Sequence, residues 1–174
     1  MLLKTTNNGV TWIRKKADNF PSASFGVIKF DFKSSNVGYL IASYSGIVKT
    51  EDGGDKFTQI YTGTPETMLF INETTGFVTD IYTKKLLKTI NGGTNWITVL
   101  DTCNILPVFF LNETTGLGVH KTTYKTVRTT NGGANWSEVL TGSVDFCSAA
   151  PDGNLIATIG NAIWKSTNAG LNWS

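Results

Sequence analysis

The sequence is poor in charge, cysteine and histidine, and each shortage excludes a class of protein. Charged residues make up only 16% of the 174 residues, against a typical ~25%, which argues against a charge-laced coiled coil or a disordered charged tail. Two cysteines are too few for a disulfide framework, and one histidine cannot build a multi-histidine metal site. No apolar run approaches the ~20 residues of a membrane-spanning helix. The formal net charge of +2 comes without a basic block, so no nucleic-acid partner is expected.

What the sequence does contain is one nine-residue pattern that occurs five times, about 40 residues apart. The pattern, called here the box, is a basic residue, Ser or Thr, any residue, Asn or Asp, any residue, Gly, two of any kind, and Trp or Phe. A second pattern, Asn-Glu-Thr-Thr-Gly after a Phe, starts at Phe70 and returns at Phe110. The four defining box residues are, copy by copy, Thr5, Asn7, Gly9, Trp12; Thr50, Asp52, Gly54, Phe57; Thr89, Asn91, Gly93, Trp96; Thr129, Asn131, Gly133, Trp136; and Ser166, Asn168, Gly170, Trp173.

Each repeat predicts four short strands, A to D, separated by turns rich in Gly and Asn. The expected strands of the first repeat are 26–32, 39–44, 47–50 and 57–61, and those of the second are 68–71, 77–82, 86–89 and 96–100. Those of the third are 108–111, 117–120, 124–129 and 136–140, and the fourth has 144–148, 155–159 and 162–166 with a strand D that barely begins. Four strands in about 40 residues is the size of a propeller blade. The sequence therefore predicts an all-β fold, a β-propeller or propeller segment of four-stranded antiparallel blades.

The repeats divide a single domain, 1–174, into units with predicted boundaries. A partial blade of strands C and D is expected at 1–19, followed by repeats at 20–62, 63–102, 103–142 and 143–174, the last truncated in strand D. The inventory is five C–D hairpins but only four A–B pairs. Because an open arc of blades exposes sheet faces and an edge, we expect the chain to continue into a longer protein or to complete a ring by self-association.

The chemistry of the box indicates a local folding device. Gly supplies the positive φ angles of a tight hairpin, and Asn or Asp can bond back to nearby amides. The Ser or Thr can bond within the same hairpin, and the aromatic residue covers it. Four boxes carry a neutral Asn, a poor ligand for hard cations, so neither a metal nor a cofactor is expected there.

The box resembles the Asp-box, the bacterial neuraminidase repeat found in propeller blades of sialidases, sortilin-type receptors and xyloglucanases. The fuller unit, with Gly38-Tyr39, Gly76-Phe77 or Gly116-Leu117 before strand B, is most similar to photosystem II assembly factor-like repeats. The resemblance implies a propeller fold, and such repeats also occur in secreted and surface proteins of bacteria. A sialidase site is excluded, because it needs three arginines and the chain has only Arg14 and Arg128.

Xyloglucanase-like hydrolysis would need two facing carboxylates. The carboxylates outside the boxes include Asp31, Glu66, Asp80, Asp101 and Asp145, and no motif selects a pair among them. His120, Cys103 and Cys147 match no catalytic motif and are interpreted as partly buried or core side chains.

One repeated feature points to a ligand. A basic residue precedes the Ser or Thr of every box, and in a ring these residues would form a positive band near one rim that could attract an acidic partner. The alternative is that each stem packs along strand C while the charged end reaches water. The five residues are Lys4, Lys49, Lys88, Arg128 and Lys165.

The function that the sequence favours is a non-catalytic binding or scaffold propeller for a protein or glycan partner. The expected location is secreted or at the cell surface of a bacterium, although Met1–Lys4 does not open a signal peptide. The alternative is a segment of a polysaccharide-active, xyloglucanase-like glycoside hydrolase.

Overall fold

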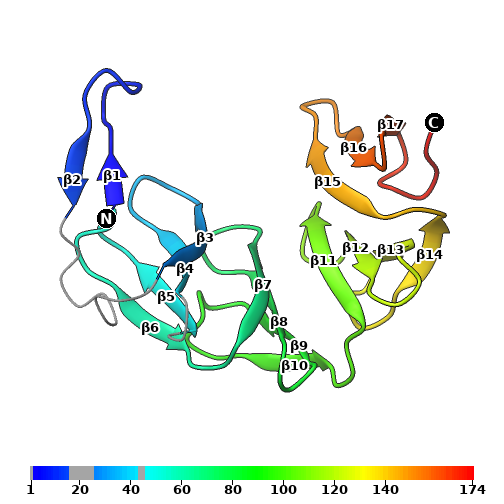
Figure 1. The fold of residues 1–174 in the computed structure, drawn as a ribbon, viewed down its shortest axis with the longest axis horizontal. Helices are drawn as coiled ribbons and strands as arrows, with labels where there is room; N and C mark the ends of the chain where they lie inside the picture. The colour runs from blue at the N-terminus through cyan, green and yellow to red at the C-terminus, as the bar shows by residue number, and fades with distance from the viewer. Residues whose placement is uncertain (1, 16–25, 43–45) are drawn as a thin grey trace. The chain divides into compact units, whose positions relative to one another are not determined.

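The computed structural model describes residues 2–15, 26–42 and 46–174 (Figure 1). Within these ranges the regular structure is β throughout, and no helix there is long and apolar enough to cross a membrane. The chain divides into two compact units, residues 1–65 and residues 66–174, which are described one at a time.

The first unit contains a hairpin and a four-stranded sheet. In the hairpin, β1 (Leu2–Lys4) pairs antiparallel with β2 (Ile13–Lys15). The sheet is an antiparallel meander of β3 (Val27–Phe32), β4 (Gly38–Ala42), β5 (Gly46–Thr50) and β6 (Thr58–Tyr61). Leu40, Val48 and Phe57 form a buried cluster on this sheet.

The second unit continues the pattern with three further sheets, each with its strands in chain order. The first sheet is β7 (Pro65–Phe70), β8 (Gly76–Asp80), β9 (Leu86–Thr89) and β10 (Ile97–Leu100). The second is β11 (Ile105–Phe110), β12 (Gly116–His120), β13 (Thr126–Thr129) and β14 (Ser137–Leu140), and the third is β15 (Val144–Ala149), β16 (Leu155–Ile159) and β17 (Ala162–Ser166).

Neighbouring sheets of the second unit share their cores. The Phe77 ring on β8 stacks on the Phe110 ring on β11, with centroids 4.0 Å apart and planes 9° apart. Phe77 and Phe110 belong to a buried cluster with Leu86 and Cys103. A second cluster joins the next pair of sheets and includes Leu117, Val119, Val144, Cys147 and Leu155. Burial of apolar side chains between sheets thus holds this unit together.

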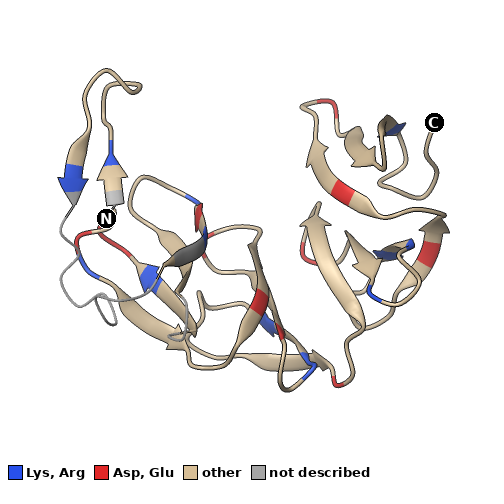
Figure 2. Ribbon diagram, in the orientation of Figure 1, with Lys and Arg blue, Asp and Glu red and all other residues tan. Residues whose placement is uncertain are grey.

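The prediction of an all-β, propeller-type fold of four-stranded antiparallel blades is confirmed. The fourth repeat has three strands, and after them the N–H and C=O of Ser174 both bond to Lys165 on β17. Charged residues are spread along the strands and turns of each unit, without a block of one sign (Figure 2).

Some strand ends differ from the prediction for local reasons. Strand A of the third repeat starts at Ile105 rather than at residue 108, because Pro107 lies at a bulge in the pairing with β12. Strand C of that repeat starts at Thr126 rather than at residue 124, because Tyr124 has a φ of 55° and belongs to the turn. The predicted strand residues Ser43 and Tyr44, and the predicted boundary between residues 19 and 20, lie outside the described residues. The repeat boundaries themselves stay predictions.

Candidate functional site

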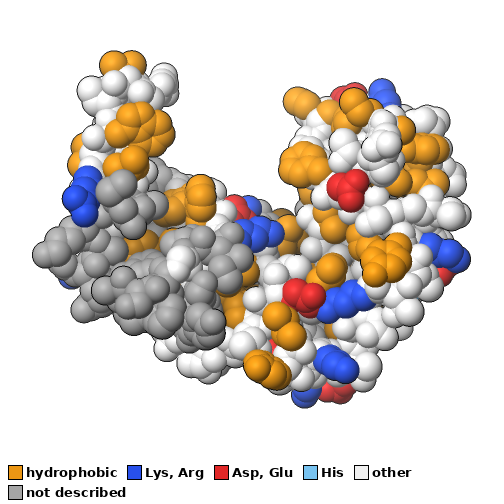
Figure 3. Space-filling model, viewed as in Figure 1, with side chains coloured by type: hydrophobic (Ala, Val, Ile, Leu, Met, Phe, Trp, Pro, Cys, Tyr) orange, Lys and Arg blue, Asp and Glu red, His pale blue; other side chains and the backbone are white. Residues whose placement is uncertain are grey.

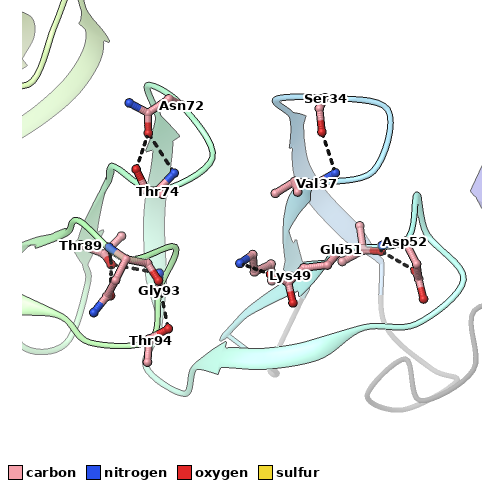
Figure 4. A network of polar contacts seen from close by, with 12 residues as sticks. Ser34, Val37, Lys49, Glu51, Asp52, Asn72, Thr74, Thr89, Gly93 and Thr94 are labelled. Carbon is pink, nitrogen blue, oxygen red and sulfur yellow. Dashed lines mark hydrogen bonds and ion pairs between the residues drawn. The ribbon is translucent and has the colours of Figure 1, made fainter.

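The five boxes are built on the same set of hydrogen bonds. In the third box the Thr89 hydroxyl accepts the N–H of Gly93 at 2.9 Å and donates to Asn91 Oδ1 at 3.0 Å (Figure 4). Asn91 Oδ1 also accepts the N–H of Asn95 at 2.9 Å. Thr50, Thr129 and Ser166 bond in the same way, and all three are buried. Thr5 makes the equivalent bond to Gly9 at an exposed hairpin. The polar atoms of the box are therefore used to close its own turn.

The Asn or Asp of the box acts through one oxygen. Asp52 Oδ1 accepts the N–H groups of Asp55 and Lys56, both at 2.9 Å, and the Thr50 hydroxyl. These bonds, chiefly the one from the Lys56 N–H, hold the pKa of Asp52 below its ordinary value. Because Asn offers the same acceptor oxygen, the four Asn boxes keep the geometry without the charge.

The aromatic residue of the box seals the turn against strand A. Trp136 Nε1 donates to Gly133 O at 2.8 Å, and the indole meets the edge of Phe110 at a centroid distance of 6.1 Å. Trp96 meets Phe70 in the same way at 6.2 Å. Phe57 is 5% exposed in its box, whereas Trp12 on the N-terminal hairpin is 58% exposed. Trp12 is thus the box tryptophan whose indole is exposed to solvent, whereas Trp96, Trp136 and Trp173 are half-buried.

Three of the five basic residues before the boxes bond to the backbone of the following repeat. Lys88 Nζ donates to Glu113 O at 3.2 Å and lies 5.5 Å from the centroid of the Phe77 ring. Arg128 Nε donates to Ala169 O at 2.8 Å, and Lys4 Nζ donates to Ser35 O at 3.1 Å. Lys49 pairs with Glu51 at 2.7 Å, and Lys165 is exposed. These contacts support a role in joining repeats, and attraction of an acidic partner by the five residues stays a prediction.

The other candidate residues have local partners. Asp31 pairs with Lys33 at 2.9 Å, Asp101 with Lys85 at 3.1 Å, and Glu66 with Lys121. Asp80 is buried at the end of β8, where Oδ1 accepts the Thr83 N–H at 2.8 Å, and Asp145 is exposed on β15.

His120 and the two cysteines also have structural surroundings. His120 Nδ1 accepts the N–H groups of Thr122 and Thr123. Cys103 and Cys147 are free thiols in the two cores, and burial raises the pKa of both, that of Cys147 to about 11. No cluster of three or more metal-ligating side chains occurs in the described ranges.

The B–C turns of the second and third repeats carry exposed aromatic side chains that the sequence analysis missed. Tyr82 is 83% exposed, Tyr124 is 68% exposed and Ile81 is 54% exposed. The two turns lie side by side, because the N–H of Cys103 bonds to Lys84 O and the N–H of Lys121 bonds to Asn104 O. We call the set Ile81, Tyr82, Lys84, Lys121 and Tyr124 the B–C rim.

The backbone of the B–C rim has the left-handed conformation at equivalent positions of its two turns. Lys84 has a φ of 54° and Tyr124 a φ of 55°. A non-glycine residue there costs about 1–2 kcal/mol, and for a bulky residue this conformation is an outlier. A conformation of this kind cannot be read from the residue type, since Gly or Asn is the usual signal.

The chain was compared with known proteins. No protein-family model and no curated protein matched it. Among solved structures it is similar to YCF48 bound to D1 peptide, with a TM-score of 0.67 and 16% identity over 99% of this chain and 60% of that one. For YCF48 from Cyanidioschyzon merolae the TM-score is 0.58 and the identity is 20%, over 86% of this chain and 55% of that one. For a GH74 enzyme from Niastella koreensis the TM-score is 0.63 and the identity is 17%, over 86% of this chain and 30% of that one.

These likenesses concern the fold, at identities of 20% or less. The chain spans about 60% of the length of the first YCF48 structure and less of the other two. The repeat pattern, the sheet topology and the solved structures agree with one another. The chain therefore has the β-propeller fold of the YCF48-like repeat proteins, as the resemblance of its repeats predicted.

Proposed function

We propose that this chain is a non-catalytic binding module whose B–C rim contacts a protein partner. The observation that carries the proposal is Tyr124, a large aromatic residue that is 68% exposed at a φ of 55°. Neither folding nor solubility benefits from that combination. Unfavourable backbone conformations that persist in a folded protein are concentrated at functional sites.

The composition of the B–C rim fits a protein surface. Tyrosine supplies a large apolar ring with a polar tip and is enriched in protein interfaces. Three lysines of these turns are paired with carboxylates: Lys85 with Asp101, Lys121 with Glu66 and Lys125 with Glu138. Lys84 makes no ion pair within the part of the chain that the structure describes. A nearly neutral aromatic surface favours a protein over a polyanion.

The solved structures give the proposal a precedent in the same fold. The YCF48 structure holds a D1 peptide, whereas the GH74 proteins are enzymes. Hydrolysis remains the alternative for this chain, but Asp31, Glu66 and Asp101 form ion pairs with lysines and not a facing pair of carboxylates. A secreted or cell-surface location in a bacterium stays a prediction.

The proposal is tested with peptides selected from a random display library on the immobilised chain. We expect the double substitution Tyr82→Ser/Tyr124→Gly to weaken the selected peptides at least about tenfold, since aromatic anchors dominate binding energy. Its stability should not fall, because Gly relieves the left-handed position. Lys84→Gly is the matched control. It removes the strain of the left-handed backbone at the equivalent position without removing an aromatic ring, and it should bind the selected peptides as tightly as the unchanged chain.

Three results would overturn the proposal. The first is a set of selected peptides that binds the double variant as tightly as the unchanged chain. The second is turnover of xyloglucan, β-glucan or sialoside substrates at enzyme-like rates, which would establish the hydrolase alternative. Retention of glycans but not of peptides on an array would assign the surface to sugars and would also contradict it.

A further inference from the structure

The turn that carries Tyr124 is closed by a histidine side chain. His120, the last residue of β12, accepts the N–H groups of Thr122 and Thr123 on its ring nitrogen Nδ1, both at 3.3 Å. The backbone closes the same turn, since the Tyr124 N–H bonds to His120 O at 2.8 Å and the His120 N–H bonds to Lys125 O at 3.0 Å. His120 thus caps the turn that places Tyr124 in the B–C rim.

The equivalent turn of the second repeat is capped by an oxygen. Asp80 lies 40 residues before His120 and is likewise the last residue of its strand B. Its Oδ1 accepts the Thr83 N–H at 2.8 Å and the Thr83 hydroxyl at 3.0 Å. The Asp80 N–H bonds to Lys85 O at 3.1 Å, as the His120 N–H bonds to Lys125 O. Two turns of the same construction therefore differ in the atom that caps them.

The two caps respond differently to acid. A ring nitrogen accepts a hydrogen bond only while it carries no proton, and both nitrogens of a protonated histidine are donors. A carboxyl group keeps an acceptor oxygen in either protonation state. Histidine is the side chain that ordinarily changes charge between about pH 5 and pH 8, and the chain has one. Acid in this range therefore removes the cap of one turn and spares the cap of the other.

The strands packed against β12 hold their charged residues away from His120. The sequence of β11 has no charged residue, and Arg128 on β13 pairs with Leu117, toward the opposite end of β12. Successive side chains of a strand point to opposite faces. Because Val119 packs against β15 and β16, His120 points away from these strands and from Asp145.

The turns and connections beside His120 do carry titratable groups. They are Glu66, Lys84, Lys85, Cys103, Lys121 and Lys125. The three lysines other than Lys84 form ion pairs, and in Figure 3 side chains of opposite charge lie beside one another on the second unit. Burial raises the pKa of the Cys103 thiol, which therefore stays protonated. Residues of these types ordinarily keep their charge between about pH 5 and pH 8, so His120 is the group that responds.

We propose that His120 makes the B–C rim release its protein partner in acid. A proton from the solvent binds Nδ1, so the N–H groups of Thr122 and Thr123 lose their acceptor and face a positive charge. The left-handed backbone of Tyr124 persists only while the surrounding structure holds it, so its ring moves as the turn opens. The closed turn binds one proton fewer than the open turn, and a falling pH therefore favours the open turn. The inference rests on the proposed binding function and adds its regulation.

The first test needs no partner and follows the turn by NMR. Between about pH 8 and pH 5 the amide signals of Thr122 and Thr123 should shift with the same midpoint as the ring protons of His120, because one protonation causes both changes. The amide of Thr83, whose acceptor is Asp80, is the internal control and should not follow that midpoint. Constant Thr122 and Thr123 signals while the ring titrates would overturn the inference.

The second test compares affinities at two pH values. It uses library-selected peptides that contain no histidine, so that the ligand does not titrate. We expect the unchanged chain to bind them about five- to tenfold more weakly at about pH 5.5 than at about pH 7.5, which corresponds to the net loss of about one hydrogen bond. In His120→Asp, which carries the cap of the equivalent turn, the two affinities should be nearly equal. His120→Asn offers the same acceptor oxygen and replaces this variant if His120→Asp does not fold.

The outcomes distinguish this inference from the proposed function. Lys84→Gly leaves the cap of the Tyr124 turn in place and should keep the acid sensitivity. Equal weakening in acid of the unchanged chain and of the His120 variants would contradict the inference, and so would an affinity of the unchanged chain that does not depend on pH. A library that yields no binding peptide would overturn the proposed function, whereas the amide signals would still decide whether the turn opens in acid.

Discussion

At the scale of single residues, a large and a small side chain exchange positions between repeats. In three repeats a Phe at the end of strand A packs against the Gly that opens strand B; a Cβ on Gly116 would lie 2.7 Å from the Phe110 ring. In the fourth repeat the same two positions hold Ala149 and Leu155, and Leu155 is 1% exposed. The space between the two strands is therefore filled in every repeat, by a side chain of strand A in three repeats and by a side chain of strand B in the fourth.

This exchange predicts a coupling between Phe110 and Gly116. Gly116→Leu should destabilise the fold by about 1–3 kcal/mol through overpacking, and Phe110→Ala by about 3–5 kcal/mol through loss of a buried ring. The double variant Phe110→Ala/Gly116→Leu should be more stable than the sum of its singles by about 1–3 kcal/mol. Urea unfolding of the four proteins measures the cycle. Additivity within about 0.5 kcal/mol would contradict the packing argument.

The pKa of Asp52 predicts an acid dependence that the other boxes lack. Because hydrogen bonds lower this pKa, the carboxylate contributes stability above the ordinary value of 3.8 and loses it as the pH falls through the lowered value. The advantage of the unchanged chain over Asp52→Asn should therefore shrink between about pH 5 and pH 2. Asn91→Asp is the reciprocal control and should create the same dependence in another box. Parallel pH profiles for all three proteins would refute the assignment.

At the scale of the element, the box and its aromatic residue form one folding unit. Trp136→Ala should cost about 3 kcal/mol, the lower end for a large aromatic residue, because the indole is only partly buried. Trp136→Phe should cost only about 1 kcal/mol, the value of the lost hydrogen bond to Gly133 O, since Phe57 already occupies this position in another box. Thermal unfolding compares the two. Equal losses would show that the ring itself is not what stabilises the turn.

Strands with clear turn signals on both sides were predictable from the sequence. The ranges 86–89, 155–159 and 162–166 were predicted as the structure has them. Strand A of the third repeat was predicted too short, because a proline normally excludes a strand and the bulge that accommodates Pro107 needs the pairing partner to be known.

The sites were less predictable than the strands, because they depend on contacts between repeats. A basic residue before each box is visible in the sequence, but its bond to the next repeat requires the position of Glu113 O or Ala169 O. The B–C rim has no spacing signal in the sequence. The only signal in the sequence that points to the B–C rim is a tyrosine in each of two equivalent turns, Tyr82 in one and Tyr124 in the other.

At the scale of the whole molecule, the two thiols report on neighbouring cores of the second unit. Cys103 and Cys147 are 2% and 6% exposed, and burial raises the pKa of each, so little thiolate forms near pH 8. Labelling by a thiol reagent should be at least about a hundredfold slower in the native protein than in denaturant. Mass spectrometry follows each site, and rapid native labelling of both would show that the cores are open.

The same experiment tests whether the two cores respond separately. Trp136 packs against the cluster that contains Cys103 and not against the one that contains Cys147. Trp136→Ala should therefore accelerate labelling of Cys103 more than that of Cys147. An equal acceleration of the two sites would mean that the second unit opens as a single cooperative body.

The hydrogen bonds of the boxes also bear on how this protein ages. Asn91-Gly92 and Asn131-Gly132 are sequences in which the glycine nitrogen can attack the asparagine side chain and release ammonia. Here the Gly92 and Gly132 N–H groups each bond at 2.8 Å, to Thr74 O and Thr114 O, and hold that nitrogen away from the reaction. Where hydrolysis did convert either asparagine to aspartate, the acceptor oxygen would remain, as Asp52 demonstrates. The turns at Asn91-Gly92 and Asn131-Gly132 are thus protected against spontaneous deamidation, and they would keep their hydrogen bonds if aspartate did form.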